Sequence, residues 1–281
     1  EEVDEKDLIT NALNGALEAL DPHSHYVPRQ EFVERQKTAR REYGGLGIEV
    51  SMENELVKVD YVIKNNKMHL TKEEIQQLDK RKRLNIINSI TGIKPANLIG
   101  TVSEDNVANV AIFSSIVHLG SNPALLGFIV RPTGEVPRNT YENILSNGRY
   151  TINAVNESFI KNAHYTSAKF DRNISEFDKC GLTDEYLHDF KAPFVKESNL
   201  KIGMKYCESI PIERNGTILV IGEVEHIIIP DKALNNKGHI DLAKAEVAGI
   251  SGLNSYYKLE KIGSFPYARV EEVPDLKTTK D

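Results

Sequence analysis

Several classes of protein are excluded by what this 281-residue sequence lacks. It holds only two cysteines, Cys180 and Cys207, too few for a disulfide framework and without metal-ligand spacing. No apolar run approaches the roughly eighteen residues that would span a bilayer. The first residues, Glu1 to Glu5, do not resemble a basic and then apolar signal peptide. We therefore expect a cytoplasmic protein with reduced thiols, no metal site and no membrane segment.

The sequence also lacks an excess of positive charge. Its net charge of −6 argues against a nucleic-acid-binding surface spread over the whole protein. Paired carboxylates and a catalytic triad are absent, and no G-x-G-x-x-G follows a strand, so we expect no Rossmann dinucleotide site. What is present is a 40% apolar content, which supports a real core in one large or two small domains.

The chain looks as if it begins a second time near Met68. Residues 1–67 carry 9 Lys and Arg against 14 Asp and Glu, whereas the remaining 214 residues carry 26 against 27. Just after this seam, Thr71 and Glu74 have the spacing of a capping box, which predicts a helix start followed by a helical stretch with Leu78, Leu84 and Ile87 on its apolar side. The pattern predicts two parts, 1–67 and 68–281.

The first part is predicted to contain two helices and a hairpin. Apolar residues recur at helical spacing over 7–20, and Asp21-Pro22 ends that helix. A second helix is expected from Pro28 or Arg29 to about Arg41. After Gly44-Gly45, the stretch "LGIEVSMENELVKVDYV" predicts two strands that turn near Glu53-Asn54.

This first part resembles the front of a carboxyl-terminal processing protease over residues 1–62. The residues that carry the resemblance are "LITNALNGALEALDPHSHYVPRQEF" and "EYGGLGIEV". In that family a helical segment leads into a PDZ domain, so the resemblance implies a partial PDZ-like hairpin. The family's serine–lysine catalytic pair lies beyond the matched stretch, so we expect no protease activity. A peptide-docking module is the alternative, for which we expect no binding, because two strands do not complete a stable sheet.

The second part is predicted to be mainly β. Short β-branched runs occur at 97–102, 108–119 and 124–132, separated by the turn signals Ser103–Asn106 and Gly120–Pro123. A helix is expected from Thr140 to near Gly148, followed by a strand in "RYTINAV". Later, Asn215-Gly216 predicts a tight two-residue turn in a long hairpin. Many strands with few helices favour a closed or nearly closed antiparallel barrel.

Residues 68–281 resemble the flavin reductase-like, FMN-binding split-barrel family. The resemblance rests on "NLIGTVSEDNVANVAIFSSI", "NPALLGFIVRP", "PRNTYENILSNGRYTINAV", "HYTSAKF", "SEFDKCGLT" and "VIGEVEHIIIP", in this order. It implies a Greek-key split β-barrel with peripheral helices. Met68 would then be the natural start of such a protein, and either a gene fusion or an artificial joining of two sequences would explain what precedes it.

FMN needs donors for a dianionic phosphate, which predicts one part of the site. Arg131 follows an apolar strand and Arg138 precedes a helix, where each guanidinium could grip phosphate oxygens. Asn139 and Thr140 stand at the start of that helix, whose free N–H groups favour an anion. The alternative is that Thr140 only caps the helix and that both arginines are solvated.

The flavin ring needs a flat wall and polar edge contacts. In the resembling family, the strand that holds Phe113, Ser114 and Ser115 passes along the ring, and alternation turns Ser114 away from the face of the other two. Ordinary sheet packing is the alternative for each serine. Asn97 and Asn109 could touch flavin or finish turns, and His164 could steer a nicotinamide or a proton or be structural.

The resemblance implies an FMN-dependent oxidoreductase that passes electrons from NAD(P)H through the flavin to free flavin or another small acceptor. Such chemistry rests on the cofactor, so few acid–base side chains are needed. An FMN-binding electron carrier without its own NAD(P)H reductase activity remains the alternative. A homodimer with flavin near the subunit junction is also implied. The aromatic tail "YYKLEKIGSFPYARV" is expected to be buried, either in such an interface or in the core of one subunit.

Overall fold

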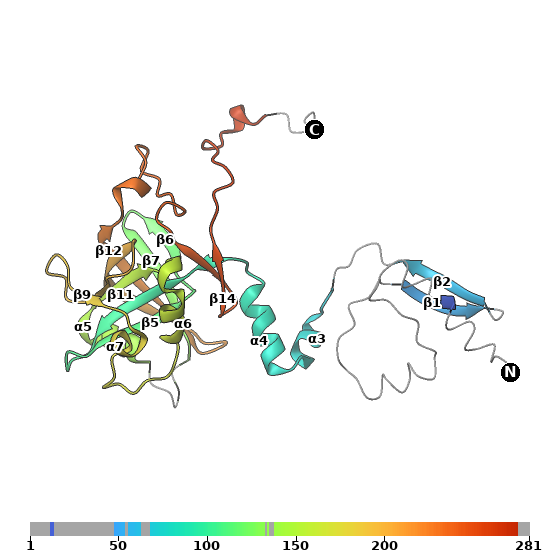
Figure 1. Ribbon diagram of the computed structural model, residues 1–281, viewed down its shortest axis with the longest axis horizontal. Helices are drawn as coiled ribbons and strands as arrows, with labels where there is room; N and C mark the ends of the chain where they lie inside the picture. The colour runs from blue at the N-terminus through green and yellow to red at the C-terminus, as the bar shows by residue number, and fades with distance from the viewer. Residues whose placement is uncertain are drawn as a thin grey trace. The chain divides into compact units, whose positions relative to one another are not determined.

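The computed structural model describes residues 12–13, 48–53, 56–62, 68–132, 134 and 138–274. The chain forms two compact units, residues 1–77 and residues 78–281 (Figure 1). No helix in the described ranges is long and apolar enough to cross a membrane.

The first unit contains the hairpin that the sequence predicts. Strands β1 (Ile48–Glu53) and β2 (Leu56–Val62) pair antiparallel, with an irregularity at Glu49/Val50. The capping box is also confirmed, because the Thr71 amide donates to Glu74 Oε2 at 2.6 Å and the Glu74 amide donates to Thr71 Oγ1 at 3.3 Å. Helix α3 (Lys72–Gln77) follows. Ala12 and Leu13 are helical, and the rest of the predicted helices over 7–20 and 28–41 lies outside the described residues.

The helical stretch after the capping box is divided in two. Helix α4 (Lys80–Ser89) starts anew at Asp79, whose Oδ1 accepts from the amides of Arg81 at 2.9 Å and Lys82 at 3.1 Å. A carboxylate satisfies the orphan donors of a new helix start, so Asp79 ends one helix and opens the next. The residues Leu84 and Ile87, predicted on its apolar side, are both exposed, and no residue of α4 is buried.

The second unit is built on a seven-stranded antiparallel sheet, and its mainly β character confirms the predicted fold class. The strand order is β5-β4-β8-β11-β12-β7-β6. The strands are β4 (Asn97–Val102), β5 (Ala108–Phe113), β6 (Val117–Ser121), β7 (Ala124–Val130), β8 (Arg149–Ala154), β11 (Lys201–Ile212) and β12 (Thr217–Ile228).

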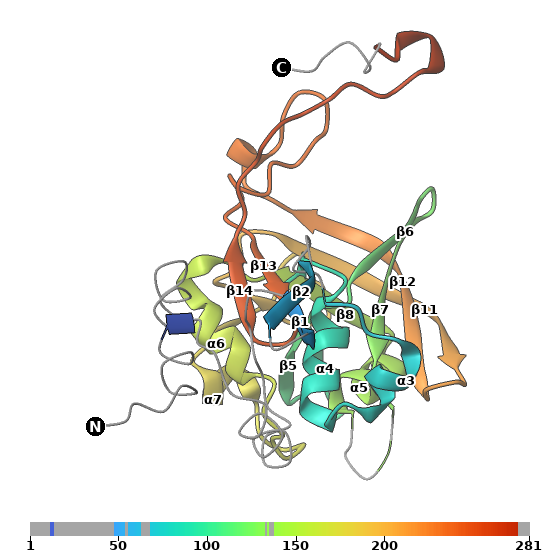
Figure 2. The same cartoon turned by 90° about the vertical axis from the view of Figure 1, so that its right-hand side faces the viewer.

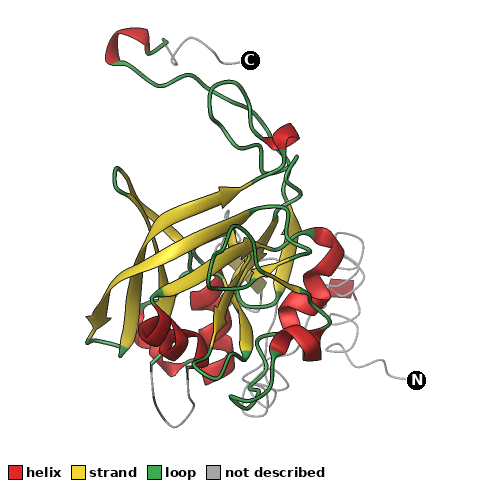
Figure 3. Ribbon diagram, turned by 90° about the vertical axis from the view of Figure 1, so that its left-hand side faces the viewer, coloured by secondary structure: helices red, strands yellow, loops and turns green. Residues whose placement is uncertain are grey.

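This sheet must be rolled up, because its two edges are joined by three residues. Strands β5 and β6 stand at opposite ends of the strand order, yet only Ser114–Ile116 separates them. In a flat sheet the edges would lie about 29 Å apart, since neighbouring strands are spaced by about 4.8 Å. Four residue steps reach at most about 14 Å. The strands therefore curl around a common interior (Figure 3). The run 108–119, predicted as one β segment, is accordingly broken at Ser114.

Three helices cover the edge strand β5. They are α5 (Asn139–Asn147), α6 (Ile160–Tyr165) and α7 (Glu176–Cys180), and all three pack against β5 (Figure 1). The predicted helix end is confirmed, because Gly148 adopts φ +66° and its amide bonds to the Ile144 carbonyl at 2.9 Å. A short 3₁₀ turn, η1 (Glu157–Phe159), leads into α6.

Smaller elements complete the unit. Strands β14 (Ser255–Lys258), β13 (Ala248–Ser251) and β3 (Lys94–Pro95) form a three-stranded sheet in that order. Strands β9 (Asp184–Glu185) and β10 (Phe194–Val195) pair with each other. Two further 3₁₀ turns are η2 (Asp231–Ala233) and η3 (Val270–Glu272).

The long hairpin β11–β12 is confirmed, but its predicted two-residue turn is wrong. Ile212 pairs with Thr217, so residues 213–216 form a four-residue loop. Gly216 takes φ +70°, whereas Asn215 is not left-handed and instead accepts from Thr217 N at 3.1 Å through Oδ1. A type I′ turn needs positive φ at both central residues. Here one glycine suffices because the wider loop needs only one left-handed position.

Tyr150 lies at the centre of the barrel core. It is fully buried among Ile99, Phe128, Met204 and Val220, and its ring meets that of Phe128 edge-on at 5.6 Å. Its hydroxyl has no hydrogen-bond partner among the described residues. Gly222 stands against this hydroxyl, and a Cβ added there would clash with it. The oxygen therefore bears a desolvation cost without compensation.

Tyr150→Phe should leave the free energy of unfolding unchanged or raise it by about 1 kcal/mol, because it removes an unpaired buried hydroxyl. Denaturant unfolding followed by circular dichroism measures this. Gly222→Ala should destabilise the wild type and cost less in the Tyr150→Phe background. A loss of more than about 1 kcal/mol in Tyr150→Phe alone would show that the hydroxyl is bonded.

Candidate functional site

A chain of buried polar side chains connects β4, β5 and the start of α5. Asn109 Oδ1 accepts from Thr101 Oγ1 at 3.0 Å and from Thr140 Oγ1 at 3.1 Å. Asn143 Nδ2, one helical turn further, donates to Thr101 Oγ1 at 3.1 Å. All four residues are buried. Because buried amides and hydroxyls are costly unless bonded, this network fixes the first turn of α5 against the sheet.

Glu176 of α7 extends the network with a buried carboxyl group. Its Oε2 accepts from Asn109 Nδ2 at 2.6 Å and from the Val110 amide at 3.2 Å. Burial raises the pKa of Glu176 above its usual value of 4.5, and these two hydrogen bonds oppose the shift. The same carboxyl group is a secondary cause of the raised pKa of the Cys180 thiol, whose main cause is burial. Glu176 therefore holds both β5 and α7 in place.

The first turn of α5 is not capped by any side chain of the described residues. Arg138 is the residue that directly precedes this helix. Thr140, which the sequence offered as a cap, directs its hydroxyl to Asn109 instead. Asn139 carries a buried Oδ1 without a partner among the described residues, and this oxygen can only accept a hydrogen bond. The first-turn N–H groups are the donors that suit an anion.

The two predicted arginines lie on either side of the short loop before α5. The guanidinium of Arg138 donates to the Pro132 carbonyl through Nε at 3.3 Å and Nη2 at 3.2 Å. That bond places its head beside the residue that follows Arg131. Arg131 is exposed and has no hydrogen bond or ion pair with any described residue. The Arg138 guanidinium therefore lies at Pro132, and a phosphate-binding role for either arginine stays a prediction.

The three predicted ring-binding residues, Phe113, Ser114 and Ser115, are all half-buried but differ in their contacts. Phe113 meets Phe128 edge-on at 5.1 Å and packs on the barrel core. The Ser115 hydroxyl is occupied, since it donates to the Ile129 carbonyl at 3.3 Å and accepts from the Ile129 amide at 3.0 Å. Ser114 is half-buried and has no partner among the described side chains and backbone groups. Of the two hydroxyls, Ser114 is the one available for a ligand.

The last two predicted site residues are Asn97 on β4 and His164 on α6. Asn97 is buried and stands opposite Phe113 in the β4–β5 register. His164, on α6, shares a hydrogen bond of 3.1 Å between Nδ1 and the hydroxyl of Tyr256 on β14. Burial raises the pKa of Tyr256 to about 12, so this phenol keeps its proton at neutral pH. His164 is thus bonded to the three-stranded sheet through Tyr256. By contrast, Asn109 and Thr140 are hydrogen-bonded to each other.

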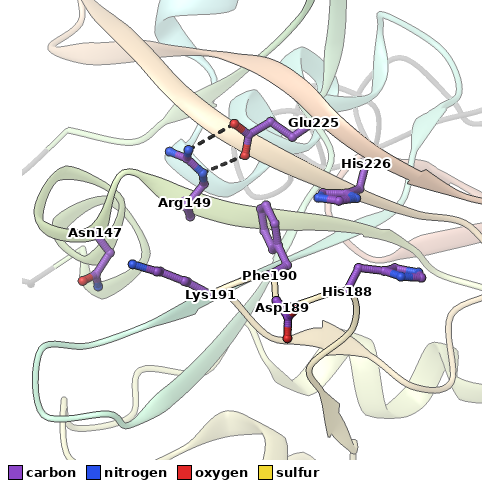
Figure 4. A pocket seen from close by; sticks show the side chains of 8 residues that line it. All are labelled: Asn147, Arg149, His188, Asp189, Phe190, Lys191, Glu225 and His226. Carbon is purple, nitrogen blue, oxygen red and sulfur yellow. Dashed lines mark hydrogen bonds and ion pairs between the residues drawn. The ribbon is translucent and has the colours of Figure 1, made fainter.

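A separate cavity lies beside the start of β8 and β12 residues Glu225 and His226. Its volume is about 360 Å³, and Figure 4 shows its lining side chains: Asn147, Arg149, His188, Asp189, Phe190, Lys191, Glu225 and His226. Arg149 is paired there with Glu225, with Nε to Oε2 at 2.7 Å. The rings of His188 and His226 stack with centroids 6.0 Å apart. None of the predicted flavin residues lines it. Its lining is mostly polar, with Phe190 as the aromatic side chain, which meets His226 edge-on at 5.3 Å.

Fold and site together define a class of protein. The rolled antiparallel sheet is the split barrel that the sequence predicts. Comparison with known proteins gives the family. Residues 93–243 match the model of the Flavin reductase like domain, and the chain belongs to that family.

Solved structures support the same assignment. A putative flavin reductase with split barrel domain from Shewanella frigidimarina is 48% identical, with a TM-score of 0.69, over 72% of this chain and 100% of its own. The flavoredoxin of Desulfovibrio vulgaris is 22% identical with a TM-score of 0.53, over 64% of this chain and 92% of its own, and shows a shared fold. The chain is therefore a flavin-related oxidoreductase.

The first unit is similar to a different protein. A carboxy-terminal-processing protease of Bartonella bacilliformis is 50% identical over 56 residues, which are 20% of this chain and 13% of that protease. The predicted resemblance is thus confirmed. The matched stretch is a small part of the protease.

Three residues of the network were not predicted as site residues. Thr101, Asn143 and Glu176 connect elements that lie up to 67 positions apart in the chain. Glu176 stands within the motif "SEFDKCGLT", but an isolated carboxylate at a helix start has an ordinary explanation as a helix-dipole partner. Only its burial against Asn109 distinguishes it.

Glu176→Gln should flatten the pH dependence of stability. Because the folded-state pKa is raised, the carboxyl group stabilises the fold while protonated, and that contribution is lost as the pH rises through the raised value. Unfolding free energies from pH 5 to pH 8 should fall less in Glu176→Gln than in the wild type. The exposed Glu208→Gln is the matched control and should keep the wild-type slope.

Glu176→Ala should behave differently from Glu176→Gln. It leaves Asn109 Nδ2 and the Val110 amide unpaired, which costs about 1–3 kcal/mol. Equal stability of the Ala and Gln variants at pH 7 would show that the carboxyl group does not hold β5.

Proposed function

We propose that this protein is an FMN-dependent oxidoreductase that passes electrons from NAD(P)H to free flavin or another small acceptor. The observation that carries the proposal is the start of α5, which no described side chain caps and where Arg138 bonds the carbonyl of Pro132, the residue that follows exposed Arg131 in the chain. A phosphorylated flavin needs donors of this kind for its phosphate, and family membership supports the flavin itself.

Each part of the site has a role in this proposal. The first-turn N–H groups of α5 and the two guanidinium groups hold the phosphate. Ser114 contributes a hydroxyl to the polar edge of the ring, and Phe113 supports the β5 end of the site from the core. When bound, FMN supplies the hydride and electron chemistry. The Asn109–Glu176 network keeps the helix start rigid and aimed, which preserves affinity by limiting the ordering needed on binding.

An electron carrier without its own reductase activity is the second candidate. The observation in its favour is that no dedicated nucleotide motif accompanies the flavin site in the sequence. Nicotinamide would then have to dock over the flavin face. We also propose a cytoplasmic location, which the free thiols of Cys180 and Cys207 support.

The visible spectrum separates these functions. The purified protein, after addition of FMN and removal of the excess, should be yellow, and NADH or NADPH should bleach it without oxygen. Bleaching by a partner reductase but not by nicotinamide alone would select the carrier. A colourless protein that takes up no FMN would refute both.

Arg138→Ala should weaken FMN binding by about 1.5–3 kcal/mol, the range for a charge-assisted hydrogen bond. Quenching of flavin fluorescence on titration gives the dissociation constant. Arg214→Ala, in the β11–β12 loop, removes the same charge elsewhere and should leave affinity unchanged. Unchanged affinity in Arg138→Ala would remove this residue from the phosphate site.

A further inference from the structure

The segment after β14 leaves the body of the second unit with its apolar side chains uncovered. We call residues 259–274 the C-terminal arm. It runs away from both sheets (Figure 2). Ile262, Phe265, Tyr267 and Val270 are 101%, 93%, 87% and 91% exposed. The sequence predicted burial for these aromatics, and the single chain does not provide it. Large apolar side chains gathered in this way mark a docking segment.

Helix α4 is a second uncovered apolar element of the same unit. Leu84 and Ile87 lie one turn apart on the helix, Ile90 is its C-cap, and Ile93 follows the left-handed Gly92; we call these four residues the apolar stripe. All four are exposed, and no residue of α4 is buried. An amphipathic helix is normally stabilised by packing of its apolar side, and the described residues do not cover that side of α4.

The arm and α4 begin at the same corner of the fold. Strand β14, which precedes the arm, pairs with β13, and β13 pairs with β3, which follows α4. At this corner the side chains of Ile93 and Leu259 both lie over Gly249. From there the arm and the helix diverge (Figure 1). Two copies that meet at this corner can therefore exchange arms within one continuous interface.

Their charges are complementary. Helix α4 begins with Lys80 and Arg81, and the 3₁₀ turn η3 near the end of the arm holds Glu271 and Glu272, the latter 3.9 Å from Arg269. When the arm runs antiparallel to α4, its aromatics lie along the apolar stripe and its two carboxylates reach the basic first turn. Such charges add little affinity but fix register and direction.

We propose that the C-terminal arm of one copy packs on α4 of a second copy, and the reverse, in a two-fold homodimer. Each buried aromatic or large aliphatic side chain removes roughly 100–200 Å² from water, so one arm and its receptor stripe bury on the order of 1,000 Å². Two reciprocal joints reach the roughly 1,200–2,000 Å² of a stable interface, whereas one arm on an unrelated partner does not. This gives a contact surface to the homodimer implied by the family resemblance, and it is independent of flavin binding.

Sedimentation of the full-length chain over a range of concentrations tests the proposal. The wild type should be dimeric. Phe265→Asp/Tyr267→Asp in the arm and Ile87→Asp on α4 should each raise the dimer dissociation constant roughly thirtyfold or more, since buried aromatic and aliphatic anchors dominate interfaces. Leu234→Asp, an equally exposed apolar position elsewhere, should not change it. A monomeric wild type, or arm and helix variants that remain dimeric like the control, would overturn the proposal.

Cross-linking distinguishes exchange from an arm that folds onto its own helix. In a Cys207→Ser background, chains with Ile87→Cys and chains with Phe265→Cys are mixed and oxidised. A disulfide-linked dimer of the two chains supports exchange. If only a chain carrying both substitutions forms a disulfide, and does so as a monomer, the arm serves its own α4 and the proposal fails. Charge reversal of Glu271 and Glu272 to Lys should weaken the dimer, and Lys80→Glu/Arg81→Glu in the same chain should restore it.

Discussion

The barrel depends on the three residues between its two edge strands. Ser114–Ile116 carries the chain from β5 to β6, which stand at opposite ends of the seven-strand order. The Ser115 hydroxyl secures this crossing, because it bonds both the amide and the carbonyl of Ile129 on β7. A side chain thus substitutes for a backbone partner where the ladder is interrupted. With the edges held together, the apolar faces enclose the core around Tyr150 and Phe128.

The same closure positions the candidate flavin site. It leaves β5 with α5, α6 and α7 packed against it. Glu176 then reaches Asn109, and Asn109 holds Thr140, so the first turn of α5 is fixed by residues from three elements. Thr140 is engaged by Asn109 and does not cap that turn, so in the proposed site its N–H groups are the donors offered to the phosphate. The buried polar network and the proposed anion site are therefore parts of one arrangement.

Local patterns predicted the elements well where one segment decides its own conformation. The Thr71–Glu74 box, the helix that ends at Gly148 and the hairpin β11–β12 all follow from capping, left-handed glycine and alternation. The predictions failed where a neighbour intervenes. Asp79 opens a second helix, the four-residue loop around Gly216 replaces a tight turn, and the run 108–119 breaks because Ser115 binds β7.

The amino-acid sequence by itself determined the family and the start of the helix that follows Arg138, because motifs and charges are local properties of the chain. Only the tertiary structure decided which candidates are available. It engages Ser115 and Asn109 in internal hydrogen bonds, leaves Ser114 and Asn139 Oδ1 without partners among the described residues, and exposes the aromatic arm. The physical reason is that a polar group's partner and a side chain's exposure depend on segments distant in the chain, whose approach is set by barrel closure.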